Sequence, residues 1–220
     1  MNGPDRLSLL LPMIAMAGAF VAGSAPAYSQ TLTFAGEQIG ALPKTFETAL
    51  TGQGQAGRWE VIEDATADDG RALAQLNSDP TDYRFPLAIY TSTSATNVEI
   101  TARFKPVSGK VDEAGGVVAR WSDNNNYYVA RANALEDNVR FYRVSAGRRQ
   151  ELAGANIRVT PREWHTLTLR AEGDKFTITY DGKSLYTTTD KTFPAAGKVG
   201  LWTKADSVTH FGRIDIKVLP

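Results

Sequence analysis

The sequence predicts an all-β protein, a sandwich of two antiparallel sheets, and three features lead to this prediction. Short segments rich in Val, Ile, Thr, Tyr and Phe recur from Trp59 onward, separated by turn residues. Several of them alternate apolar and polar residues, which is typical of a sheet with one face on a core. No segment after residue 27 sustains a helical period for more than two turns. Two such sheets stacked on their apolar faces form a sandwich.

Residues 1–27 have the pattern of a signal peptide. Arg6 precedes the apolar run LSLLLPMIAMAGAFVAG, and Ala25-Pro26-Ala27 has the small-x-small pattern of a signal-peptidase site. The run contains Pro12, and no second apolar span of the roughly 20 residues that a membrane anchor needs follows it. We therefore predict cleavage after Ala27 and a periplasmic or secreted protein without a membrane anchor.

The remaining chain is predicted to be a single domain. Residues 28–57 are rich in Gly, Thr and Gln and are expected to form one strand near Leu32 and then a long loop. Residues 58–220 are expected to form the sandwich. The chain has no cysteine, which excludes disulfides, thiolate metal ligands and a cysteine nucleophile. Its 24 basic and 24 acidic residues balance and are interspersed, so we expect no nucleic-acid partner.

Thirteen segments of the sandwich domain read as strands because each is short, β-prone and bounded by turn residues. In order along the chain they are residues 58–63, 71–76, 86–91, 97–107, 115–121, 127–133, 139–144, 149–154, 164–172, 175–181, 183–189, 198–204 and 210–219. Two of the turns have a stated cause. Gly173-Asp174 and Asp181-Gly182 supply the positive φ that tight hairpins require.

Alternation predicts which side chains share a face. In residues 164–172, His165, Leu167, Leu169 and Ala171 are expected on the apolar face, with Trp164, Thr166, Thr168 and Arg170 opposite. In residues 175–181, Phe176, Ile178 and Tyr180 are expected on the apolar face.

The order of segments in the second half resembles a known superfamily. The resemblance rests on the strand with WHTL, the hairpin with YDGK, and the strand GKVGLWT followed by HFGRIDI. This set is similar to the concanavalin A-like jelly-roll superfamily in its laminin-G-like form, and closest to the bacterial exported 3-keto-disaccharide hydrolase-type domains. The resemblance implies two curved antiparallel sheets with any ligand on the concave face or at the rim loops.

The residues bear on two kinds of sugar chemistry. Glucanases of this fold carry E-x-D-x-x-E on a strand, and that motif is absent here. Chemistry on 3-keto glycosides would need a base and a group that stabilises an enolate. His165 is interpreted as structural because it shares parity with Leu167 and Leu169, and His210, just before the strand 210–219 begins its alternation, is interpreted in the same way. With no carboxylate at ligand spacing, the two histidines do not indicate a metal site. Asp64, Asp68 and Asp69 are interpreted as a solvated turn. We expect no cofactor, and a structural calcium bound by loop oxygens stays open.

Arginines on the predicted strands are the other candidates. Parity sets Arg140 apart from Arg143, while Arg120, Arg131, Asn133 and Arg140 can share a polar face. The segment GLWTKADS adds possible contacts on the same surface. The predicted ligand-binding residues are therefore Arg120, Arg131, Asn133, Arg140, Trp202, Lys204 and Asp206. The alternative for Arg120, Arg131 and Asn133 is a solvated face with cross-strand charge pairs, for example to Glu136. Trp121, Trp164 and Trp202 read individually as core residues.

Three functions remain open from the sequence. The first is a carbohydrate-binding or carbohydrate-associated domain with a polar concave face. The second is a hydrolase or lyase acting on 3-keto glycosides through the same face, and the third is a laminin-G-like protein-interaction module. The sequence names neither the sugar nor the oligomeric state.

Overall fold

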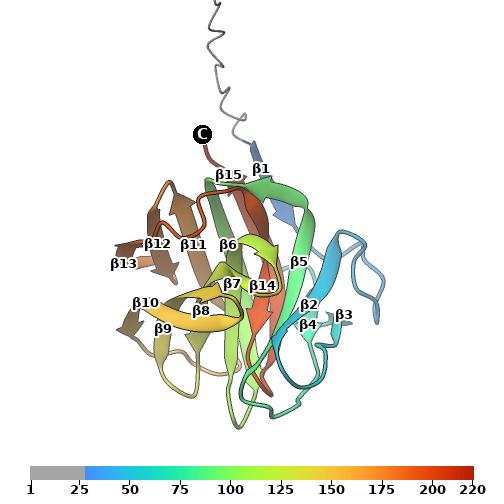
Figure 1. Cartoon of the computed structure of the whole chain (residues 1–220). Coiled ribbons are helices and arrows are strands. Elements are labelled where there is room, and N and C mark those ends of the chain that lie inside the picture. The colour runs from blue at the N-terminus through green and yellow to red at the C-terminus, as the bar shows by residue number, and fades with distance from the viewer. Residues whose placement is uncertain (1–27) are drawn as a thin grey trace, which may run out of the picture.

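The computed structural model describes residues 28–220, which form two antiparallel sheets, so the predicted all-β sandwich is confirmed (Figure 1). Sheet A runs in the order β13-β12-β11-β6-β15-β4-β3, with β1 also paired to β15. Its strands are β1 (Tyr28–Leu32), β3 (Trp59–Glu63), β4 (Arg71–Gln75), β6 (Val98–Ser108), β11 (His165–Glu172), β12 (Lys175–Tyr180), β13 (Lys183–Thr189) and β15 (Val208–Val218). The predicted signal peptide, residues 1–27, lies outside the described residues.

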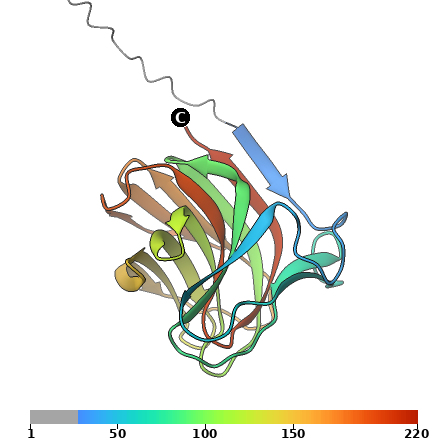
Figure 2. The same cartoon turned by 45° about the vertical axis from the view of Figure 1, so that its right-hand side comes forward.

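Sheet B runs in the order β10-β9-β8-β7-β14-β5-β2. Its strands are β2 (Phe46–Gly52), β5 (Arg84–Ala95), β7 (Ala114–Asp123), β8 (Asn126–Asn133), β9 (Asn138–Ser145), β10 (Arg148–Asn156) and β14 (Gly197–Thr203). The two sheets face each other, and β1 lies beside β15 (Figure 2).

The segment before the sandwich domain contributes one strand to each sheet. β1 covers the strand expected near Leu32, but the long loop expected after it is interrupted by β2, which pairs with β5 from Phe46–Tyr90 to Gly52–Arg84. β2 is an edge strand with only Phe46 and Thr51 buried. Because most of its side chains face solvent, its sequence lacks the apolar alternation that marks a strand.

Sheet A packs one face on the core and exposes the other. On β11, His165, Leu167, Leu169 and Ala171 are all buried, as alternation predicted. The apolar face of β12 is buried in the same way. These side chains meet the inner face of sheet B in one large cluster, which includes Phe104, Tyr128, Phe141 and Phe211.

Sheet B differs from sheet A because its outer face is also apolar. Phe85, Leu87, Val118, Val129 and Trp202 belong to a second buried cluster on that face. Both faces of the central strands of sheet B are therefore covered, whereas alternation alone predicts one solvated face.

The two hairpin turns form where the sequence places them. Gly173 has φ +58° between β11 and β12, while Asp181 and Gly182 have φ +45° and +74° between β12 and β13. No helix in residues 28–220 has the length and hydropathy needed to span a bilayer.

Candidate functional site

Sheet B curls so far that distant strands are bridged across its outer face. The Tyr83 hydroxyl, just before β5, donates a hydrogen bond to the Gly147 carbonyl oxygen (2.9 Å) and accepts one from the Arg149 backbone N–H (3.0 Å). β5 and β10 stand five strand spacings apart in the sheet. In a flat sheet they would be about 24 Å apart, well beyond the reach of one tyrosine. We call the outer face of sheet B the concave face.

Stacked rings fill the middle of the concave face. Phe85 and Trp202 stack with their ring centres 5.3 Å apart, and the Arg149 guanidinium lies 4.4 Å from the centre of the Tyr142 ring. Trp202 is 0 % exposed, so the predicted ligand-binding residue Trp202 is covered in this structure and offers no surface to a sugar ring.

Polar groups gather at the end of the concave face where β8 meets β9. The Arg131 guanidinium donates hydrogen bonds to Asn138 Oδ1 (2.7 Å), Glu136 Oε2 (2.8 Å) and the Tyr142 hydroxyl (3.2 Å). Burial opposes ionisation of Glu136, but hydrogen bonds from Asn138 and Arg131 outweigh it and hold the pKa of Glu136 below its usual range. Glu136 is therefore a fixed, ionised carboxylate at neutral pH.

A second ion-pair group lies at the same end of the sheet. Lys204 Nζ is 2.7 Å from Asp112 Oδ2 and 2.9 Å from Asp82 Oδ1. The Asn133 amide nitrogen donates to Asp112 Oδ1 (2.8 Å). Burial raises the pKa of Asp112, although Lys204 acts against this shift.

In each group the cation is buried and one carboxylate is open to solvent. The side chains of Glu136 and Asp82 are 44 % and 75 % exposed, whereas those of Arg131 and Lys204 are largely buried. Each open carboxylate is thus oriented by a cation that cannot move freely. Such an arrangement presents hydrogen-bond acceptors with a set direction, and it can hold a ligand that donates hydrogen bonds.

The structure brings four of the predicted residues to the concave face. Arg131 pairs with Arg140 across β8 and β9, and Asn133 precedes the loop that carries Glu136. Arg140 lies 3.4 Å from Glu151, and Lys204 completes the set. That these residues bind a ligand stays a prediction.

Asp206, also predicted to bind ligand, holds a loop. Its carboxylate accepts hydrogen bonds from the backbone N–H groups of Lys110 (2.7 Å), Val111 (3.0 Å) and Asp112 (3.0 Å). These three bonds fix the β6–β7 loop and thereby place Asp112 beside Lys204.

Arg120, expected on the same face as Arg131, points the other way, so this expectation is wrong. Ala119 still pairs with Tyr128, but the register then shifts, and Arg120 has φ +52°. This bulge turns the side chain toward the inter-sheet core. There the guanidinium donates to the Thr96 and Phe193 carbonyl oxygens (both 2.8 Å) and to Gly173 O.

Some residues of the site were missed by the sequence reasoning. Asn138 and Tyr142 share parity with Arg140, and this signal could have identified them. Asp82 and Asp112 lie in loops before β5 and β7, where no periodicity indicates direction. Glu136 is the partner proposed for Arg131 in the charge-pair alternative, and that pairing is present.

The histidines have carboxylate partners that the sequence spacing did not reveal. His165 Nδ1 is 2.8 Å from Asp181 Oδ2, and His210 Nδ1 is 2.7 Å from Asp64 Oδ2. Asp64 is buried, so the interpretation of a solvated turn is wrong for it. The expectation of a core position is wrong for Trp164, which lies on the outer face of sheet A beneath two cationic side chains.

Comparisons with known proteins concern the fold. No protein-family model and no curated protein matches the chain. Among solved structures, the carbohydrate-binding module CBM66 of Bacillus subtilis is 23% identical with a TM-score of 0.59, covering 76% of this chain and 92% of its own. Domain 4 of AbnA, a GH43 extracellular arabinanase of Geobacillus stearothermophilus, in complex with arabinotriose, is 12% identical with a TM-score of 0.57, covering 86% and 90%.

A third solved structure extends the same likeness. The GH16 protein of the Bacteroides ovatus mixed-linkage glucan PUL, in complex with a product, is 10% identical with a TM-score of 0.60, covering 85% of this chain and 99% of its own. These likenesses span nearly the whole described chain and agree with its two curved antiparallel sheets. The chain therefore has the two-sheet jelly-roll sandwich fold that the resemblance of its second half implies.

Proposed function

We propose that the protein is an exported carbohydrate-binding domain that holds sugar hydroxyls at the polar end of the concave face. The observation that carries the proposal is the pair of open carboxylates, Glu136 and Asp82, each fixed by a buried cation. Sugar hydroxyls donate to such carboxylates, and Arg140, whose side chain is partly exposed, can donate to hydroxyl oxygens in return.

Other observations support the two parts of this proposal. Two of the similar structures are a carbohydrate-binding module and a domain in complex with arabinotriose, which favours a carbohydrate ligand. The pattern of residues 1–27 favours export. The absence of a nucleic-acid partner and the laminin-G-like alternative stay predictions.

Calorimetric titration of the full chain with a panel of ordinary and 3-keto disaccharides tests the binding function. Glu136→Gln replaces the ionised acceptor by a neutral one. Loss of one charge-assisted hydrogen bond, about 1.5–3 kcal/mol, raises the Kd roughly tenfold or more. Glu172→Gln is the matched control, because Glu172 is similarly exposed and also pairs with an arginine, but on sheet A. Equal Kd values for Glu136→Gln and the unmodified chain would contradict the proposed site.

A second candidate is an enzyme acting on 3-keto glycosides, and Asp112 is the observation that favours it. A buried carboxyl with a raised pKa beside the open groups of a concave site is a candidate general acid or base. The same panel is therefore followed for product as well as heat. If Asp112 acts in turnover, Asp112→Asn binds 3-keto disaccharides but releases no product. Heat of binding without product from the unmodified chain excludes this second function.

A further inference from the structure

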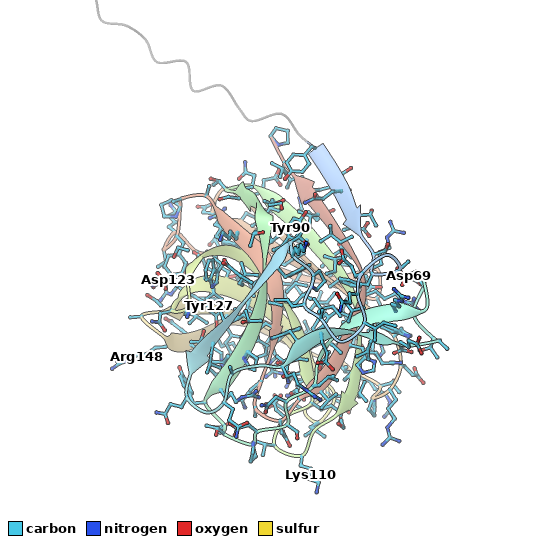
Figure 3. All side chains as sticks on the ribbon, turned by 90° about the vertical axis from the view of Figure 1, so that its right-hand side faces the viewer. Asp69, Tyr90, Lys110, Asp123, Tyr127 and Arg148 are labelled. Carbon is cyan, nitrogen blue, oxygen red and sulfur yellow. The ribbon has the colours of Figure 1, made fainter. Side chains whose placement is uncertain are left out.

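A separate cavity of about 740 Å³ lies at the loop end of the sandwich. Its walls come from the connections β4–β5, β6–β7, β10–β11 and β14–β15, and Lys110 marks this end of the molecule, opposite the start of β1 (Figure 3). The polar side chains that line it are those of Ser78, Ser108, Lys110, Glu113, Arg162 and Asp206. A pocket of this volume accommodates a small organic ligand.

Glu113 is an unpartnered carboxylate in the wall of this cavity. It is 7 % exposed, and its Oε1 is buried without a hydrogen-bond partner among the described residues. Burial also raises the pKa of Glu113, although Arg162 acts in the opposite direction. The neighbouring carboxylates are different, because Asp112 pairs with Lys204 and Asp206 accepts three backbone N–H groups. A buried polar group without a partner costs free energy unless something else donates to it.

The wall around Glu113 is held firmly. Asp206 fixes the β6–β7 loop through its bonds to the backbone, and a Cβ at Gly109 would lie 1.7 Å from the Asp112 carbonyl oxygen, so the turn requires glycine. Across the cavity, the Arg162 backbone N–H donates to the Pro106 carbonyl oxygen (2.6 Å). These contacts fix the backbone on either side of the cavity, from which Glu113 and Arg162 project.

The chemistry of the wall selects the ligand. Glu113 needs a hydrogen-bond donor, while Lys110 on the same loop and Arg162 across the cavity need acceptors. Each hydroxyl of a polyol is both a hydrogen-bond donor and an acceptor, and the ring faces of Pro80 and Pro161 can contact the C–H groups of a polyol. We propose that this cavity is a second carbohydrate site, which takes the end of a neutral oligosaccharide with Glu113 as acceptor for its hydroxyls. The proposal does not depend on the site at the concave face.

Amide chemical shifts of the ¹⁵N-labelled full chain, titrated with arabinotriose, cellotriose, maltotriose and xylotriose, test this site. At least one trisaccharide is expected to shift the amides of Ser108, Lys110 and Arg162. Glu113→Gln is expected to weaken that binding tenfold or more. This variant removes an unpartnered buried charge, so its melting temperature is expected to stay the same or rise, which separates lost binding from unfolding. Glu163→Gln, an exposed change in the same loop as Arg162, is the matched control and is expected to bind normally.

Three results would overturn the second site. They are a Kd for Glu113→Gln equal to that of the unmodified chain, the absence of shifts in the β6–β7 loop with every trisaccharide, and shifts confined to the surroundings of Glu136. The last result would leave the proposed function standing. Conversely, loop shifts that survive Glu136→Gln but not Glu113→Gln support the cavity even if the concave face binds nothing.

Discussion

Arg120→Met tests the finding that this arginine is a buried structural residue and not part of a ligand site. Methionine keeps the apolar stem near Phe176 but removes three hydrogen bonds from a charged donor to carbonyl oxygens. At about 1.5–3 kcal/mol each, the loss is at least roughly 4 kcal/mol. We use this lower bound because Thr96 and Gly173 also line a surface cavity, where water can rehydrate their carbonyls. Arginine and methionine at position 120 are strained equally by the positive φ, so this strain does not contribute to the difference in stability.

The assay is urea and thermal unfolding of the two variants Arg120→Met and Arg143→Met. Arg143 also makes three side-chain hydrogen bonds, but its side chain is 23 % exposed, so water can replace part of what Arg143→Met removes and the expected loss is smaller. For a domain of this size, a loss of 1 kcal/mol lowers the melting temperature by about 2–4 °C, so Arg120→Met is expected to melt roughly 8–16 °C below the unmodified chain. A difference below about 1 kcal/mol between the variants would refute the reasoning. Sugar binding by folded Arg120→Met is expected to be normal.

Two further predictions concern stability. Burial raises the pKa of Asp64, but bonds from Lys105 and His210 among others outweigh this and hold it well below its ordinary value of 3.8. The ionised Asp64 carboxylate therefore stabilises the folded protein fully above about pH 4, and this stabilisation is lost as the pH falls toward the lower pKa of the folded state. In urea titrations, the difference in unfolding free energy between the unmodified chain and Asp64→Asn is expected to shrink from about pH 7 to about pH 2.5. Gly197→Ala would place its Cβ 2.5 Å from the Arg120 backbone carbon, and we expect it to lower the free energy of unfolding by about 1–3 kcal/mol. Gly36→Ala is the control, because its Cβ meets nothing within 4 Å, and its melting temperature is expected to be unchanged. Equal melting temperatures for the two variants would contradict the close packing at Gly197.

Alternation predicted the faces of β11 and β12 because the pleat of a strand determines them directly. Leu167 and Leu169 need no information from elsewhere in the chain to be placed. The same rule put Arg131 and Arg140 on one face, and they are cross-strand partners. Regular strands therefore carry their side-chain directions in the local sequence.

The rule failed at Arg120 because a bulge depends on distant packing. The backbone of Gly197 on β14 lies against Arg120, and the register of β7 shifts at this point with both of its neighbours. No residue of GGVVARW records that contact. The positions of the carboxylates of the candidate site could not be predicted from the sequence, for a related reason. Asp82 and Asp112 lie in loops that meet at Lys204, and their distance is set only once β5, β7 and β14 have assembled.

The position of β15 also determines when this protein can fold. β15 borders β6 along one edge and, in turn, β4 and β1 along the other. Tyr28 pairs with Val218, which is 218 − 28 = 190 residues away. Closing so long a loop is slow, and strand edges left open meanwhile can join other chains. Until β15 has been synthesised, β1, β4 and β6 therefore lack their shared partner, and sheet A cannot be completed.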